Sequence, residues 1–80
     1  MPCYESLEYN WEHILAEHPN MTKEIIDAVL EEPCQEYPRR HDGRKRFWKV
    51  LDGLKYVVVV KEWNAYEAYV VTGYPVEPKR

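Results

Sequence analysis

The chain has 80 residues, a length that suits one folded domain and leaves no room for a second hydrophobic core. Its longest aliphatic run, Val57–Val60, is far shorter than the roughly 18 apolar residues that span a bilayer, and its start shows no signal peptide. We therefore expect one cytoplasmic domain over residues 1–80 that makes no membrane contact, with a core over residues 6–75 and a C-terminal tail over 76–80.

The net charge of −3 averages over two opposed halves of the chain. Residues 1–36 carry a net charge of −8, whereas residues 37–80 carry +5. Many of the basic residues gather in residues 37–49, where Lys and Arg side chains can displace counterions from a nucleic-acid backbone. This cluster predicts a polyanionic partner, and a merely solvated basic hairpin is the alternative.

The first expected element is a helix that Ser6 caps and Pro19 ends. Its apolar stripe consists of Leu7, Trp11, Ile14, Leu15 and His18. On this pattern His18 points at the sheet from the last turn of the helix, whereas His13 lies on the opposite side of the helical wheel.

A second helix is expected between Thr22, its N-cap, and Pro33. Its apolar face consists of Ile25, Ile26, Val29 and Leu30. Two short amphipathic helices cannot form a core by themselves, so the rest of the chain has to supply a sheet.

The second half of the chain reads as an antiparallel meander. The expected strands cover residues 44–51, 55–61 and 66–74. Asp52-Gly53 and Asn64-Ala65 are the expected turns, and a short strand over residues 34–37 is expected at an edge. The run Val57–Val60 predicts a central strand that is buried on both faces. The expected fold class is therefore α+β, with two N-terminal helices packed on an antiparallel sheet of three or four strands.

The cysteines and histidines predict no metal site and no cofactor. Cys3 and Cys34 are too few for a zinc cage, and their separation says nothing about a disulfide, so in a reducing cytosol both are expected to be free thiols. His13 and His18 are five residues apart, which is not the spacing of a helical zinc pair, and no HExxH motif is present.

The chain does offer the groups that cleave RNA without a metal. Such cleavage needs a base for the 2′-hydroxyl, a cation for the phosphoryl oxygens and an acid for the leaving 5′-oxygen. Histidine suits the first and last roles, and the planar fork of arginine suits the second. Thr72 and Tyr74 are two residues apart on one strand, so they project from the same face. The candidate catalytic residues are His13, His18, Arg46, Thr72 and Tyr74.

Each of these residues also has an ordinary structural interpretation. His18 can serve as a helix C-terminal residue, His13 can be a solvated surface residue, and Thr72 and Tyr74 are common strand residues.

Cations alternate along the expected strand over residues 44–51, so both of its faces carry charge and its beginning is expected to be exposed. The candidate RNA-binding residues are Arg39, Arg40, Arg44, Lys45 and Lys49. Trp48, Trp63 and Tyr66 can stack on bases, although aromatic residues of a small domain more often fill its core.

Over roughly residues 9–75 the chain resembles the small phage- and bacteria-associated nuclease-like family grouped with barnase, EndoU, colicin-type tRNases and RelE toxins. The resemblance is carried by the segment His13-Ile-x-x-x-His18-Pro19, a helix closing on Glu32-Pro33, an Arg-rich strand, and Val70-Val-Thr72-x-Tyr74. Gly73 stands where a small residue such as alanine is expected.

This resemblance implies a metal-independent ribonuclease fold that handles RNA on exposed strands and loops. It also implies a toxin or phage-linked effector, with an inhibitor or antitoxin protein as a second partner. The predicted function is therefore a metal-independent endoribonuclease. One alternative is a catalytically silent module of the same fold that binds RNA or an acidic protein. The other is a protein with no nucleic-acid role, whose acidic helices and basic hairpin meet head-to-tail in an oligomer.

Overall fold

The computed structural model describes residues 3–38 and 43–76. Arg39 and Arg40, predicted to bind RNA, and residues 77–80 of the predicted tail lie outside the described residues. The elements are β1 (Ser6–Tyr9), α1 (Trp11–Glu17), α2 (Lys23–Val29), β2 (Lys45–Leu51), β3 (Leu54–Glu62) and β4 (Glu67–Val76). This is an α+β structure with two helices and a four-stranded sheet, as the sequence predicts.

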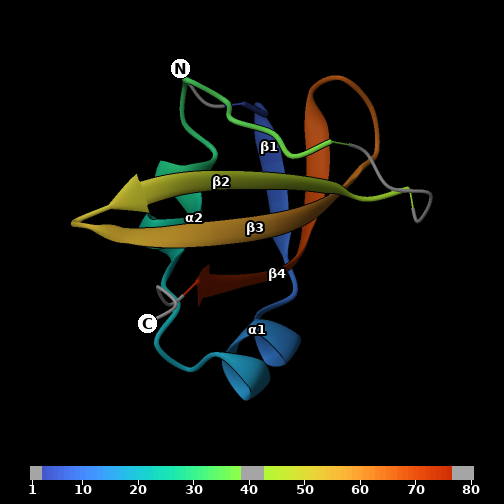
Figure 1. Ribbon diagram of the computed structural model, residues 1–80. Coiled ribbons are helices and arrows are strands. Elements are labelled where there is room, and N and C mark those ends of the chain that lie inside the picture. The colour runs from blue at the N-terminus through green and yellow to red at the C-terminus, as the bar shows by residue number, and fades with distance from the viewer. Residues whose placement is uncertain (1–2, 39–42, 77–80) are drawn as a thin grey trace.

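The sheet has the strand order β1-β4-β3-β2, so β3 is an inner strand (Figure 1). β3 pairs antiparallel with both β2 and β4, which confirms the predicted meander and its central valine strand. β1 pairs parallel with β4, from Ser6 opposite Glu67 to Tyr9 opposite Val70. The sheet is therefore mixed, and the prediction of a purely antiparallel sheet is wrong.

The N-terminal segment corrects the predicted first helix. Ser6 begins a strand instead of capping a helix, and Leu7 lies on that strand. The helix starts only after Asn10, and Ile14 is its one buried residue. Leu15, predicted on the same apolar stripe, is 46% exposed. Residues 6–9 instead pair their backbone with β4 along one edge of the strand.

The second helix begins as predicted. The Thr22 hydroxyl accepts a hydrogen bond from the Ile25 backbone N–H at 3.2 Å, and Ile26 and Val29 are buried. The helix ends at Val29, several residues before Pro33. In the part of the chain that the structure describes, no helix is both long enough and apolar enough to cross a membrane.

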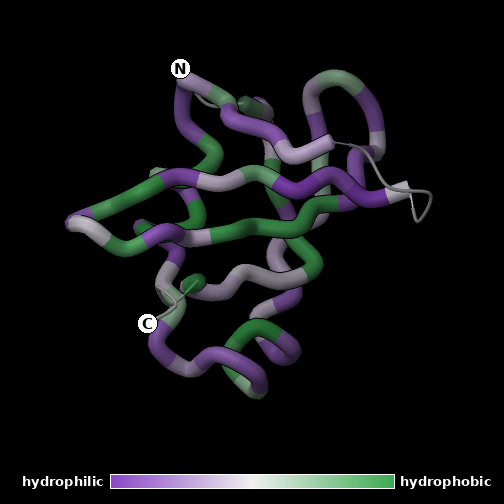
Figure 2. Tube along the Cα trace, in the orientation of Figure 1, coloured by the Kyte–Doolittle hydropathy of each residue, from purple (hydrophilic) through white to green (hydrophobic). Residues whose placement is uncertain are grey.

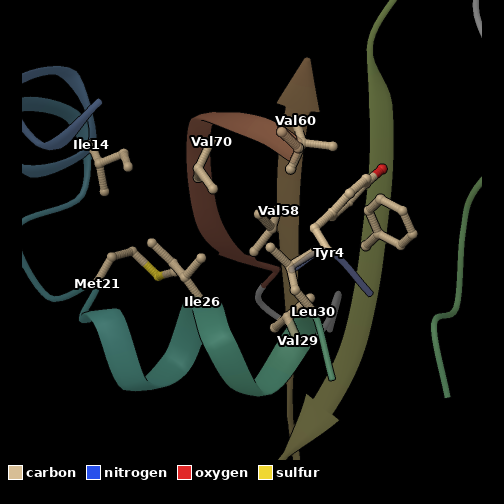
Figure 3. Packing of buried hydrophobic residues seen from close by; sticks show 11 residues of the cluster. Tyr4, Ile14, Met21, Ile26, Val29, Leu30, Val58, Val60 and Val70 are labelled. Atoms are coloured by element: carbon tan, nitrogen blue, oxygen red, sulfur yellow. The ribbon is translucent and has the colours of Figure 1, made fainter. Parts of the chain in front are cut away.

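The main core lies between the helices and one face of the sheet (Figure 3). Val58 and Val60 of β3 point into it with Val70 of β4 and Ile26 of α2. Val57 and Val59 alternate with them on the opposite face and are nevertheless only 2% and 5% exposed. The valine run is therefore buried on both faces, as predicted, and Figure 2 shows it as the apolar stretch of β3.

Both predicted turns are present. The β2–β3 hairpin turns at Asp52 and Gly53, whose φ angles are 52° and 80°. At the β3–β4 turn, Asn64 Oδ1 accepts hydrogen bonds from the backbone N–H groups of Tyr66 and Glu67 at 2.8 and 3.0 Å. These two turns fix the register of the three strands that carry the candidate site.

Cys3 and Cys34 form a disulfide with a Cα–Cα distance of 6.0 Å, so the prediction of free thiols is wrong. The two cysteines meet because the segment before β1 runs beside the end of α2, where the Cys3 N–H donates to the Leu30 carbonyl. After Cys34 the chain pairs with the outer edge of β2: the Tyr37 N–H donates to the Arg46 carbonyl at 2.8 Å. The predicted edge pairing is therefore present, but it is an isolated bridge between Glu36 and Phe47 and not the strand predicted over residues 34–37.

Gly73 lies on the helix-facing side of β4, where a Cβ atom would stand 3.0 Å from Met21 Cε and 3.6 Å from a Val58 methyl carbon. We expect Gly73→Ala to change the free energy of unfolding by less than about 1 kcal/mol, because the end of a methionine side chain shifts easily. Gly73→Val is expected to cost about 1–3 kcal/mol, because its γ-carbons overfill the contact. Urea denaturation measures both values, and equal losses for the two variants would contradict this account.

Candidate functional site

One face of the sheet carries no helix or strand of the described chain, and we call it the open face. In Figure 1 α2 lies behind β2 and β3, and the near side of these strands is left uncovered. Residues that alternate with the core-facing ones point to it. Those of the three long strands include Arg46, Trp48, Val57, Val59, Thr72 and Tyr74.

The strand register brings three of the predicted residues together on this face. Arg46 pairs with Val59, and Val59 pairs with Thr72, so these residues form one row across three strands. Tyr74 lies in the next row, opposite Val57. Adjacent strands are about 4.8 Å apart, so an arginine side chain on β2 can reach a ligand that also touches β4.

These rows form a groove with a volume of about 790 Å³. The groove is lined by Tyr37, Pro38, Arg44, Arg46, Val57, Val59, Thr72, Tyr74 and Val76. Its cations come from β2 and the residue before it, and its hydroxyl groups come from β4 and from Tyr37, with buried valines of β3 between them. Such an arrangement can hold an anion between the cations and the hydroxyl groups while an apolar part of the same ligand packs against the aromatic rings.

A third cation stands near the groove. Lys55 Nζ lies 4.7 Å from the ring centroids of both Tyr37 and Trp48, an arrangement that holds the ammonium group by cation–π attraction. Neither a carboxylate nor an imidazole is among the described residues that line the groove. The charged side chains among these described residues are therefore cationic, and none of them is a group that most often acts as a general base.

His18 lies beside Tyr74, outside the groove. It is the C-cap of α1, and its ring centroid is 5.8 Å from that of Tyr74. It lines a separate cavity of about 370 Å³ together with Glu17, Tyr56 and Pro75. His18 thus reaches β4 as predicted, and Tyr74 connects it to the groove.

His13 is not brought to the groove. Its side chain is exposed on α1, and it is not among the residues that line the groove. The two histidines of the predicted His-x-x-x-x-His segment therefore have different surroundings, and only His18 contacts a predicted partner.

Lys45 and Lys49 point to the helix-facing side of β2, away from the groove. Lys45 Nζ forms an ion pair with Glu62 at 3.0 Å. Lys49 Nζ donates hydrogen bonds to the carbonyls of Ala28 and Glu31, where it satisfies the C-terminal end of α2. These are contacts within the fold, and neither lysine is among the described residues that line the groove, so the structure does not place the two with the predicted RNA-binding residue Arg44.

Sequence reasoning missed Tyr37 and Lys55 as parts of the site. Both could have been found from strand alternation, because Lys55 is two residues from Val57 and Tyr37 ends the predicted edge segment beside β2. The sequence did not show that Tyr37 and Lys55 share the open face, which the helices leave uncovered.

A further cavity of about 340 Å³ lies on the helix side and is unsuited to an anion. There the Tyr9 hydroxyl and the Lys23 ammonium both donate to Asp27. Burial and the hydrogen bond to Asp27 raise the pKa of Tyr9 above its usual range, and the same carboxylate raises the pKa of Lys23. These groups satisfy one another, and Glu5 and Glu31 add negative charge to the lining.

Comparison with known proteins adds no relative to this picture. No protein-family model matches the chain, and no curated protein or solved structure matches it either. The resemblance to the barnase, EndoU, colicin and RelE grouping stays a prediction.

Proposed function

We propose that the protein binds single-stranded RNA on the open face, with a phosphodiester held between Arg46 and Thr72. The observation that carries this proposal is the convergence of Arg44 and Arg46 with Thr72 and Tyr74 on one groove. Guanidinium groups donate parallel hydrogen bonds to two phosphate oxygens, and a hydroxyl group can donate a third. Such contacts position a nucleic-acid backbone without reading its sequence.

The groove suits a nucleotide chain better than a small free anion. Its lining includes the exposed apolar side chain of Val76, and Tyr37 and Tyr74 contribute aromatic rings. Unstacked bases and riboses can occupy such surfaces, whereas a duplex keeps its bases away from them.

The charge distribution supports the same proposal. The acidic residues of the helices are Glu12, Glu17, Glu24 and Asp27. The helices pack against the core-facing side of the sheet, and none of these four carboxylates lines the groove. A chain with a net charge of −3 can therefore still present a cationic groove to a polyanion.

A second candidate function is metal-independent cleavage of RNA in the same groove, and the contact between His18 and Tyr74 favours it. In this reaction a base takes the proton of the 2′-hydroxyl, the 2′-oxygen attacks phosphorus, and the 5′-oxygen leaves with a proton. The products are a 2′,3′-cyclic phosphate and a 5′-hydroxyl. A barnase- or RelE-like arrangement belongs to this candidate, which ranks second because His18 stands outside the groove.

The binding proposal predicts that Thr72→Val and Tyr74→Phe each weaken the affinity for single-stranded RNA by about five- to tenfold, because each removes a hydroxyl that bonds to phosphate. Fluorescence anisotropy with a labelled RNA in EDTA measures the affinity. Lys23→Gln is the matched control, because it removes an exposed cation from the helix side. Failure of the wild-type protein to bind RNA, or equal affinity of all three variants, would contradict the proposal.

The same mixtures separate the two candidates. Cleavage products that end in a 2′,3′-cyclic phosphate, and that disappear in His18→Gln and Tyr74→Phe, would establish the second candidate. RNA that is bound and recovered intact would leave binding alone.

A further inference from the structure

The open face continues from the groove toward the β3–β4 turn. Lys61 alternates with Val59 along β3, so it points to the open face, as does Tyr69, its partner on β4. Trp63 follows β3, and its backbone N–H donates to the Glu67 carbonyl at 2.9 Å. Its ring centroid is 6.2 Å from that of Tyr69, and Lys61 Nζ lies 5.5 Å from its centroid. These contacts hold an indole ring in place at this end of the face.

Exposure distinguishes Trp63 from Trp48. Trp63 is 54% exposed, and the neighbouring Tyr66 is 62% exposed. Trp48 is half-buried, and the ammonium of Lys55 already lies over its ring. An aromatic ring that is fixed by its neighbours and still half open to solvent is a suitable surface for a nucleic-acid base, so Trp63 offers the better platform.

The groove and Trp63 are separated by a short stretch that carries positive charge. Trp63 lies four residues beyond Val59, or about 13 Å at the rise of a β-strand. Arg44 and Lys61 stand level with each other along this path, because Lys45 pairs with Val60. At the ~3.4 Å spacing of stacked nucleotides the path has the length of about four nucleotides, and of fewer in an extended strand.

Acidic residues mark the other side of this path. Glu8 of β1 is exposed on the same face, opposite Tyr69, and the exposed Glu67 lies beside the turn that follows Trp63, where its carboxylate accepts a hydrogen bond from Asn64. The charge of Glu8 repels phosphates from the β1 side. A nucleotide strand is therefore directed over β2 and β3, from Arg46 past Lys61 to Trp63.

We propose that Trp63 is a base-stacking residue at one end of a track that begins in the groove, and that the track takes about four nucleotides of single-stranded RNA. This inference rests on the RNA binding proposed above. It adds a second contact point and a defined length to that function.

Oligoadenylates of one, two, four and six nucleotides, without metal, test the length of the track. Affinity is expected to rise up to about four nucleotides and then to change little. Trp63→Leu is expected to weaken binding of the four-nucleotide oligoadenylate (the RNA tetramer) by roughly tenfold. Binding of the two-nucleotide one (the RNA dimer) should be unaffected, because it fills only the groove. Trp63→Phe keeps an aromatic ring and should retain most of the affinity. Leu15→Ala is the control, since it alters a similarly exposed apolar residue on α1.

Four-nucleotide oligoadenylates in which one position lacks its base identify the base that stacks on Trp63. An abasic position at one end should weaken binding to the wild-type protein but not to Trp63→Leu. If Trp63→Leu binds the tetramer like the wild type while Thr72→Val still weakens it, the stacking proposal is overturned and RNA binding stands. Equal losses for dimer and tetramer in Trp63→Leu would also overturn it. If no oligonucleotide binds the wild type, both proposals fail.

Discussion

Replacement of both cysteines by serine is expected to lower the free energy of unfolding by about 3–4 kcal/mol. The Cys3–Cys34 disulfide closes a loop across a sequence separation of 31 residues, and opening it frees that loop in the unfolded chain. Small domains are stable by only about 5–15 kcal/mol, so this loss is a large share of the total. Denaturation in guanidinium chloride measures it as a lower midpoint.

Reduction of the wild-type protein supplies the control. Dithiothreitol should lower the wild-type midpoint to that of Cys3→Ser/Cys34→Ser and should leave the variant unchanged. Loss of the disulfide should also speed hydrogen exchange at the Tyr37 amide, since Cys34 anchors the segment that pairs with β2. If the oxidised wild type and the double variant unfold at the same denaturant concentration, the disulfide does not constrain the unfolded chain.

The disulfide also bears on where the protein acts. Disulfides persist in oxidising compartments and are rare in the cytosol, and Cys34 is exposed. The predicted cytoplasmic location therefore conflicts with this bond. Measuring whether Cys3 and Cys34 are oxidised or reduced in cells would decide between an oxidising compartment and the cytoplasm.

The hairpins were predictable because their signals are local. Asp52-Gly53 provides the positive φ angles that a tight turn needs, and an unbroken valine run is typical of an inner strand. Thr22 was predictable as an N-cap for the same reason, because its side chain bonds to a backbone group three residues later. Each of these features depends on neighbours within one turn or one strand.

β1 was not predictable in this way. Leu7 falls on the same helical stripe as Trp11 and Ile14, and nothing local shows that the helix begins only after Asn10. What makes residues 6–9 a strand is a parallel pairing with residues 67–70, some 60 positions away in the sequence. Such pairing leaves little trace in a four-residue segment.

The candidate site was predictable in its residues and not in its arrangement. Alternation predicts that Arg46 and Lys45 face opposite ways and that Thr72 and Tyr74 face the same way. Whether Arg46 shares a face with Thr72 depends on the register of β2, β3 and β4, including the irregularity between Val59 and Val60. Which face the helices cover is a further long-range property. It determines that Lys45 and Lys49 make contacts on the helix-facing side.

Replacement of Arg44 and Arg46 together by glutamine is expected to weaken the affinity for single-stranded RNA by about a hundredfold at low salt. Each guanidinium that bonds to phosphate contributes about 1.5 kcal/mol or more. The slope of log affinity against log salt concentration should also fall by about 1.4, because each phosphate contact on a single strand contributes ~0.7. Anisotropy titrations between about 50 and 200 mM salt measure both quantities.

Lys45→Gln/Lys49→Gln is the matched control for this experiment. It removes the same formal charge from the same strand, on the face that packs against the helices. Because Lys45 and Lys49 both make structural contacts, circular dichroism is needed to check that each variant is folded. The salt slope of this control should stay close to the wild-type value, because its lysines touch no phosphate. If both pairs of substitutions lower the slope equally, RNA responds to overall charge alone and the groove between β2 and β4 is not its binding site.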